Sequence, residues 1–308
     1  MTDRTADAST GGGGRRRHRL LLPTAMVLAL VVIGTAAWAF SRGPATGSPR
    51  PERTGSASKT LALSRSLPFY GLLYTRTPAD ARIDTAKQRL TTSCMAAQGH
   101  RYEPAKRERS ESRGLALFGI EPGSDADPEP AAAQSEQPRS QAFRRALFGD
   151  PAKTISAQGE RFKVTRPATG CQAEAERKLV GSEREKLLGL QLRLGDGESE
   201  ALSQLQRDAR YAAANKRWRT CMRESGYDAA DPLALLRTLP RGADLRTHPA
   251  TVADLRCKER TGYLADVYGR LAQLQQKWLD SHQDVLRSWR ALKNRQDDAA
   301  RRILADAP

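Results

Sequence analysis

One uninterrupted apolar stretch near the start of the chain limits what the rest of it can be. Residues 20–40 read LLLPTAMVLALVVIGTAAWAF and contain no charged side chain. As an α-helix rising 1.5 Å per residue, this stretch is about 31 Å long, which matches the hydrocarbon thickness of a bilayer. Four arginines and one histidine precede it at 15–19. Because positively charged flanks stay on the cytoplasmic side, we expect residues from Ser41 onward to lie outside the cell.

The same stretch permits a second interpretation, a signal sequence that is removed. Ala37-Trp38-Ala39 fits the small-x-small pattern of a signal peptidase site, which would place cleavage near Ala39. The apolar run is longer than an ordinary signal-peptide core, so an uncleaved anchor is favoured. We therefore expect a single-pass protein of the cell membrane with its C-terminal domain outside, or alternatively a secreted protein.

Composition divides the chain into four parts. Residues 1–19 are expected to form a polar cytoplasmic tail, 20–40 the transmembrane anchor, and 41–60, rich in Gly, Pro and Ser, a flexible linker. Residues 61–308 are expected to form an extracytoplasmic helical bundle whose fold class is all-α. Within this domain, 106–139 is charged and rich in Pro, Ser and Glu, which predicts a mobile loop.

Turn and cap residues suggest where helices begin and end. Thr77-Pro78 supplies the N-cap and first-turn residues of a helix that Gly99 ends. Gly195-Asp196-Gly197 is interpreted as a break between helices. After it, one helix is expected from about Glu198 to Ser225.

The strongest pattern is a heptad-like apolar stripe from about Val252 to Leu304. It predicts one long C-terminal helix of coiled-coil type, packed antiparallel against other helices of the same chain. Unbroken, such a helix would be on the order of 75–80 Å long. Residues seven apart in the stripe are Cys257, Leu264, Leu271, Trp278, Val285, Leu292 and Ala299.

A short element, Cys-Met-x-x-x-Gly, occurs twice, at Cys94–Gly99 and Cys221–Gly226. A Tyr and then a Pro follow each copy, and one more cysteine, Cys171 or Cys257, comes later near the expected start of a helix. We call this repetition the echo. It indicates that in both copies the later cysteine lies against the end of the helix that carries the earlier cysteine. It predicts structural disulfides Cys94–Cys171 and Cys221–Cys257, although four cysteines permit three connectivities. Each closure contributes about 4 kcal/mol in the chain-entropy model.

A metal site and a redox pair are the alternatives for these cysteines. A metal site needs clustered ligands, and the chain has no Cys-x-x-Cys and no histidine partner beside a cysteine. A catalytic thiol needs a resolving cysteine or a His base, and His100 lies beyond the Gly99 stop from Cys94. Structural disulfides in an oxidising compartment are therefore favoured. Calcium is discounted at 125–136, because Pro130 stands where a calcium loop requires glycine.

Together these motifs resemble a group of secreted or membrane-anchored actinobacterial proteins with repeated Cys-Met-x-x-x-Gly-Tyr motifs. The matching elements include Cys221–Tyr227, Gly-Cys-x-x-Glu-Ala at Gly170–Ala175, Ala-Leu-Phe-Gly at Ala146–Gly149, and the final cysteine-bearing helix. The likeness covers roughly Leu61–Leu304. It implies a helical, disulfide-bonded envelope protein, and it supplies no reaction, cofactor or catalytic residue.

The net charge is +16, and arginine outnumbers lysine 40 to 11. A high-GC genome accounts for the arginine excess, whereas attraction to polyanions is the functional interpretation. Outside the cell, those polyanions are wall polymers or anionic lipid headgroups, not nucleic acid.

The chain contains none of the nucleophile-elbow, metalloprotease, phosphate-loop or dinucleotide motifs. We therefore expect a non-enzymatic envelope protein, without cofactor or metal, that acts by contact with another envelope protein. The alternative is a basic module that binds an anionic wall polymer or ligand. A wall-active hydrolase is the third hypothesis, since the sequence does not give the separation of carboxylate pairs.

Overall fold

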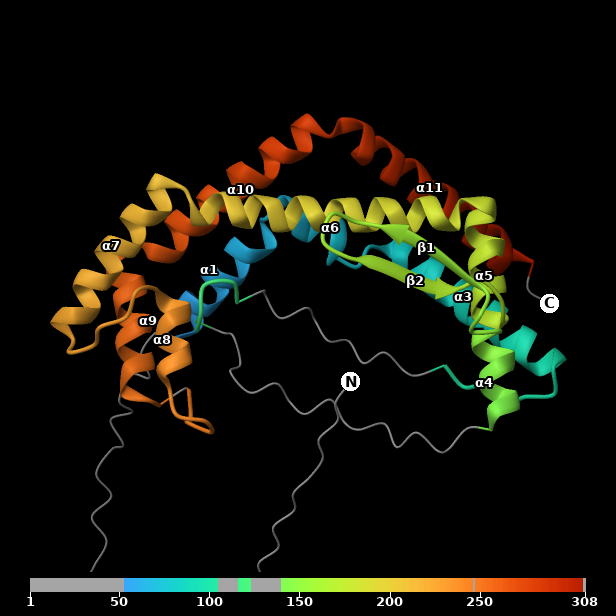
Figure 1. Cartoon of the computed structure of the whole chain (residues 1–308), viewed down its shortest axis with the longest axis horizontal. Helices are drawn as coiled ribbons and strands as arrows, with labels where there is room; N and C mark the ends of the chain where they lie inside the picture. The colour runs from blue at the N-terminus through green and yellow to red at the C-terminus, as the bar shows by residue number, and fades with distance from the viewer. Residues whose placement is uncertain (1–52, 105–115, 123–139, 246, 307–308) are drawn as a thin grey trace, which may run out of the picture. The chain divides into compact units, whose positions relative to one another are not determined.

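The computed structural model describes residues 53–104, 116–122, 140–245 and 247–306 (Figure 1). The tail expected at 1–19, the anchor expected at 20–40 and residues 41–52 of the expected linker lie outside these ranges. Within the described ranges, no helix combines the length and apolar character needed to cross a bilayer.

The described chain is mostly helical, as expected, with one added β-hairpin. Residues 53–60, expected as the end of the linker, lie in the first helix. The elements are α1 (Arg53–Arg65), α2 (Pro68–Leu73), α3 (Pro78–Ala97), α4 (Gln141–Phe148), β1 (Thr154–Gln158), β2 (Lys163–Pro167), α5 (Cys171–Val180), a 3₁₀ turn η1 (Gly181–Glu183), α6 (Arg184–Gln206), α7 (Ala209–Glu224), α8 (Pro232–Thr238), α9 (Pro249–Thr261), α10 (Tyr263–Ser281) and α11 (Gln283–Ala305).

Several helix ends follow the predicted local chemistry. The Thr77 side chain caps α3 by accepting a backbone N–H. Beyond α3 and α7, Gly99 and Gly226 adopt φ values of 76° and 84°, which favour glycine. The N–H of the residue after each glycine donates to the carbonyl of Met95 or Met222 at 2.9 Å. The two copies of the echo therefore end their helices with the same hydrogen-bonded turn.

The C-terminal stripe does not form one helix, so the prediction of a long unbroken coiled-coil helix is wrong. Breaks at Gly262 and His282 divide it into α9, α10 and α11 (Figure 1). Gly262 has a left-handed φ of 64°, and the His282 ring stacks on Trp278 with centroids 3.9 Å apart. After the second break, α11 packs against α3, α5 and α6. Heptad spacing identified buried positions, but long-range packing decided where the helix bends.

The expected break at Gly195-Asp196-Gly197 is also wrong, because α6 continues through it. A Cβ added to Gly197 would overlap the Trp278 ring, so glycine permits a close approach of α6 and α10. The buried Asp196 carboxylate accepts the backbone N–H of Glu160 at 2.8 Å. The helix is interrupted later, at Asp208, which caps α7. The prediction of one helix from Glu198 to Ser225 is therefore wrong as well.

The β-hairpin was not predicted. Its strands are antiparallel, with Thr154 opposite Pro167 and Gln158 opposite Lys163. The hairpin packs along α6, and the Asp196 hydrogen bond holds its turn (Figure 1). The all-α prediction therefore covers most of the described chain but misses this element.

Part of the segment expected as a loop at 106–139 is packed against the domain. Phe118 is 2 % exposed, and its ring meets Tyr268 edge-on with centroids 5.0 Å apart. Phe118 thereby joins the largest apolar core of the described residues, with Leu117 packed beside it, and α6, α7, α9 and α10 also build this core. Residues 106–115 and 123–139 lie outside the described residues.

We predict opposite effects for two alanine substitutions in α6. Gly197→Ala should lower the free energy of unfolding by about 1–3 kcal/mol, because the new methyl group overlaps the Trp278 ring. Gly195→Ala meets nothing within 4 Å and should raise it by roughly 0.5–1 kcal/mol through helix propensity. Chemical denaturation with intact disulfides measures both, and a stabilising Gly197→Ala would contradict the close approach.

Candidate functional site

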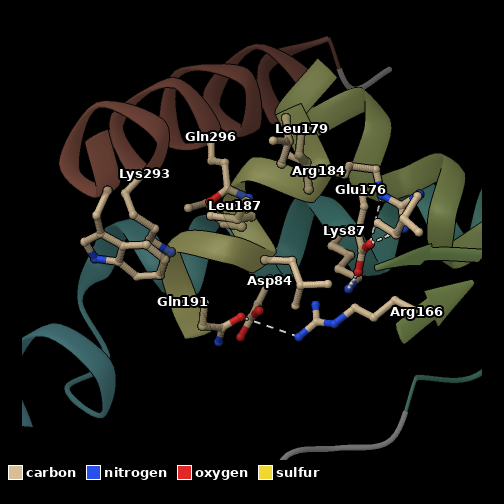
Figure 2. Close-up of a pocket in the computed structure, with 15 residues that line it drawn as sticks. Asp84, Lys87, Arg166, Glu176, Leu179, Arg184, Leu187, Gln191, Lys293 and Gln296 are labelled. Carbon is tan, nitrogen blue, oxygen red and sulfur yellow. Dashed lines mark hydrogen bonds and ion pairs between the residues drawn. The ribbon is translucent and has the colours of Figure 1, made fainter. Parts of the chain in front are cut away.

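A pocket of about 300 Å³ lies between α3, α5, α6, α11 and the hairpin (Figure 2). Ile83, Leu179 and Leu188 contribute apolar surface to it. Its charged side chains are four cations and two acids: Lys87, Arg166, Arg184, Lys293, Asp84 and Glu176.

A second pocket of about 550 Å³ adjoins the first. The two share Asp84, Gln191, Trp289 and Lys293 as lining residues. The second pocket adds Arg76, Arg290 and Asp80 to the charged set. We call the two pockets together the basic groove, because six cationic side chains line it against three acidic ones.

Most of these charges are paired within the groove. Glu176 accepts from Lys87 at 2.7 Å and from Arg184 at 2.6 Å (Figure 2). Burial alone would raise the pKa of Glu176, but the hydrogen bonds and charges of these two cations outweigh it and hold the pKa below its ordinary value. The other pairs are Lys293–Asp80 at 2.6 Å and Arg76–Asp84 at 3.0 Å.

Two arginines of the groove have no acidic partner within the described part of the chain. Arg166, on β2, donates to the amide oxygen of Gln191 at 3.5 Å (Figure 2). Arg290, on α11, is exposed and makes no ion pair with a described residue. Guanidinium groups present several donors in a planar fork that fits a carboxylate or a phosphate. These two side chains are therefore available to an external anion.

Trp289 gives the groove an aromatic surface where its two pockets meet. The Lys293 ammonium lies 5.9 Å from the centroid of this ring. An aromatic face beside cations suits a ligand that combines a ring or an apolar group with a negative charge.

One carboxylate holds α11 against α3 and so shapes the groove. Asp297 accepts two hydrogen bonds from Arg82, each at 2.8 Å, and two from Arg301, at 2.8 Å and 3.1 Å. The hydrogen bonds from Arg82, then those from Arg301, hold the pKa of Asp297 well below its ordinary value. Asp297 therefore stays ionised in the folded protein at neutral pH.

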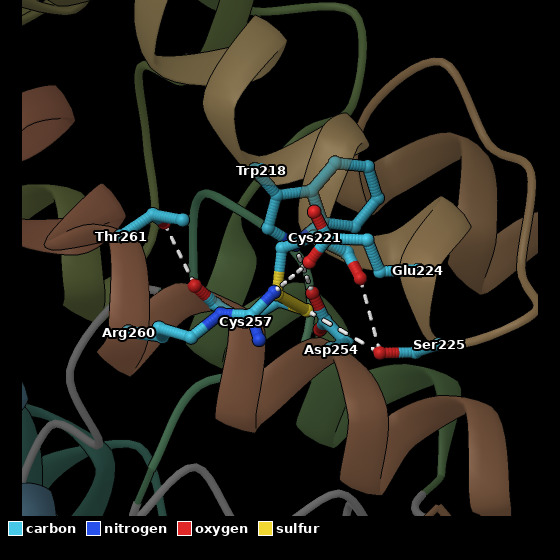
Figure 3. The surroundings of a disulfide bond; sticks show 8 residues. All are labelled: Trp218, Cys221, Glu224, Ser225, Asp254, Cys257, Arg260 and Thr261. Atoms are coloured by element: carbon cyan, nitrogen blue, oxygen red, sulfur yellow. Dashed lines mark hydrogen bonds and ion pairs between the residues drawn. A yellow bond between two sulfur atoms is a disulfide. The ribbon is translucent and has the colours of Figure 1, made fainter.

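The structure joins the cysteines as Cys94–Cys171 and Cys221–Cys257, the two pairs that the echo predicted. The first disulfide ties α3 to α5, and the second ties α7 to α9 (Figure 3). Cys171 is the first residue of α5, as expected, but Cys257 lies toward the end of α9, because Gly262 ends that helix.

A buried charged network beside the second disulfide was not predicted. The Lys258 ammonium donates to Asp254 at 2.8 Å and to the carbonyl of Ile120 at 2.6 Å. Asp254 also accepts from the Trp218 indole at 2.9 Å (Figure 3). The side chains of Asp254 and Lys258 are each 1 % exposed. Burial raises the pKa of Asp254 and lowers that of Lys258, although their attraction opposes both shifts. Only the i,i+4 spacing of the pair is visible in the sequence.

The described histidines serve separate local contacts. His100 packs against Phe143, His248 accepts the Ala250 N–H, and His282 stacks on Trp278. Among the described residues, no three His, Cys, Asp or Glu side chains gather as metal ligands do.

We predict that Asp297→Asn destabilises the protein in a pH-dependent way. Because the folded pKa is depressed, the ionised carboxylate contributes stability above the ordinary aspartate pKa of 3.8 and loses it as the pH falls further. The unfolding free energies of wild type and Asp297→Asn should therefore differ at pH 7 and converge in acid. The exposed neighbour Asp298 supplies the control, and Asp298→Asn should change the unfolding free energy at pH 7 by less than about 0.5 kcal/mol.

We predict that Lys258→Met lowers the unfolding free energy by about 3–5 kcal/mol, because Asp254 then stays buried without its cation. The double variant D254N/K258M should recover much of this loss, since it removes both charges together. Lys277→Met on the exposed side of α10 is the matched control and should change stability by less than about 0.5 kcal/mol. Equal effects of the two lysine substitutions would show that the buried pair has no special energetic role.

Comparison of the chain with models of known protein families, with curated proteins and with solved structures finds no match in any of the three.

Proposed function

We propose that this chain is a membrane-anchored, non-enzymatic binding protein of the cell envelope, and that it binds an anionic envelope polymer in the basic groove. The observation that carries the proposal is the charge of the groove. Six cationic and three acidic side chains line it, and Arg166 and Arg290 have no acidic partner among the described residues.

The proposed location rests on the sequence. Residues 20–40 have the length and composition of a single span, and the preceding arginines favour an outside domain. Two disulfides fit an oxidising compartment. The resemblance to anchored or secreted actinobacterial proteins agrees with this placement, and cleavage near Ala39 would give a secreted form with the same groove.

The groove favours the polymer over the protein partner that the sequence placed first. A repeating phosphate or carboxylate polymer can occupy two adjoining pockets with successive charges, while Trp289 contacts its sugar or alkyl part. Contact with another envelope protein would need an acidic segment at the same place. Binding to purified wall material that contains no protein distinguishes the two.

The test is a pull-down of the full chain on protein-free wall polymer at low and high salt. We expect binding at low ionic strength that falls as salt screens the charges. Arg290→Glu and Arg166→Glu should each weaken binding by about three- to tenfold, because each reverses a charge that faces the ligand.

Arg287→Glu is the matched control, since Arg287 is also exposed on α11 but lines neither pocket of the groove. An equal loss with Arg287→Glu would show that only overall charge matters. Binding that salt does not change would overturn the electrostatic basis of the proposal, and clear lysis of peptidoglycan in a zymogram would contradict its non-enzymatic part.

A further inference from the structure

The two disulfides differ in how far a reductant can reach them. Cys171, Cys221 and Cys257 are buried, at 0 %, 3 % and 1 % exposure, whereas Cys94 is partly exposed. Thiol–disulfide exchange requires a thiolate to reach one of the two sulfurs. Of the four cysteines, Cys94 is the one residue that is not buried, so a reductant would approach the Cys94–Cys171 bond from the Cys94 side.

When a thiolate attacks one sulfur of a disulfide, the other sulfur leaves as a thiolate. The helices place the sulfurs that would leave from the two disulfides in opposite electrostatic surroundings. Cys171 is the first residue of the ten-residue helix α5, where the positive end of the helix dipole stabilises a thiolate. Cys221 and Cys257 lie in the last two turns of α7 and α9, near the negative ends of those helices. A thiolate released there gains no such stabilisation.

The side chains four residues after Cys94 and four residues after Cys221 occupy equivalent positions in the repeated motif. They increase the difference between the two disulfides. Gln98, four residues after Cys94, has its amide nitrogen 3.1 Å from the Cys171 sulfur and 3.6 Å from the Cys94 sulfur, so it can donate a hydrogen bond to a thiolate at Cys171. Ser225 holds the matching place after Cys221, and its hydroxyl is 3.9 Å from the Cys257 sulfur. One group acts in the other direction, because a Glu174 carboxylate oxygen lies 3.5 Å from the Cys94 sulfur and repels an approaching thiolate.

We propose that Cys94–Cys171 is a thiol–disulfide exchange site, which an external dithiol reduces in preference to Cys221–Cys257 by attack on Cys94. As the new bond between the reductant and Cys94 forms, the Cys94–Cys171 bond breaks, and its electron pair leaves with Cys171 as a thiolate. The second thiol of the reductant loses its proton and attacks the reductant's own sulfur in the mixed disulfide. This step releases Cys94, and two electrons have then passed from the dithiol, now a cyclic disulfide, to the protein.

The first test uses the full chain in detergent with dithiothreitol as the reductant. Samples are quenched in acid, unfolded, alkylated with N-ethylmaleimide and mapped by mass spectrometry. We expect Cys94 and Cys171 to become reduced at least about tenfold faster than Cys221 and Cys257. Equal rates, the reverse order, or no reduction before the protein unfolds would each overturn the proposal.

The second test locates the attack with glutathione, a monothiol that leaves a mixed disulfide on the attacked sulfur. We expect the trapped adduct on Cys94, and an adduct mainly on Cys171 would overturn the assigned direction.

Single substitutions then test whether the side chains near the sulfurs, and not only the exposure of Cys94, set the rate of reduction. Gln98→Ala should slow reduction of Cys94–Cys171 several-fold, and Glu174→Gln should speed it. Ser225→Ala is the matched control at the second disulfide and should leave the order of reduction unchanged. If Gln98→Ala does not change the rate, the proposed stabilisation of the leaving thiolate is wrong. If Glu174→Gln does not change it, the proposed repulsion of the attacking thiolate is wrong.

Discussion

The close approach of α6 and α10 at Gly197 and Trp278 is the contact on which the arrangement of this domain depends. Without a side chain at Gly197, the indole lies directly against the backbone of α6. The preceding residue, Asp196, then reaches the hairpin turn, and the indole nitrogen donates to Glu200 at 2.9 Å. The His282 ring stacks on the same indole, at the point where α10 ends. One tryptophan therefore connects the helix crossing, the hairpin and the bend before α11.

The basic groove is a consequence of that bend. Since α11 leaves the line of α10 at His282, it packs against α3, α5 and α6. Its side chains Trp289, Arg290 and Lys293 then face groups from elements far away in the sequence. The cations of the domain consequently have two roles. Some, such as Lys258, are buried in ion pairs that hold helices together, while Arg166 and Arg290 in the groove are exposed and have no acidic partner among the described residues.

The two disulfides are similar in sequence and different in surroundings. Each uses the cysteine of a Cys-Met-x-x-x-Gly motif at the end of a helix. One ties α3 to the start of α5, and the other ties α7 to the later part of α9. Because α3 and α5 both line the basic groove, the more accessible bond covalently joins two of its walls. A change in its redox state would therefore act close to the proposed binding surface.

The sequence by itself determined the features that depend on neighbouring residues. These include the cap at Thr77, the helix stops at Gly99 and Gly226, the mostly helical character, and the two cysteine pairs through the repeated motif. Such features are predictable because a few adjacent residues set the backbone conformation.

Tertiary structure alone decided the features that depend on distant partners. Gly195-Asp196-Gly197 has the composition of a break, yet it stays helical because Trp278 and the hairpin turn pack against it. The heptad stripe has the pattern of one helix, yet it divides at Gly262 and again at His282, and the second break lets α11 bury its apolar face on α3 and α5. The groove could not be predicted either, because its charges come from separate segments that the sequence shows only as an excess of arginine. Local chemistry sets where a helix can start or stop, and the burial of its apolar face against the rest of the chain decides where it does.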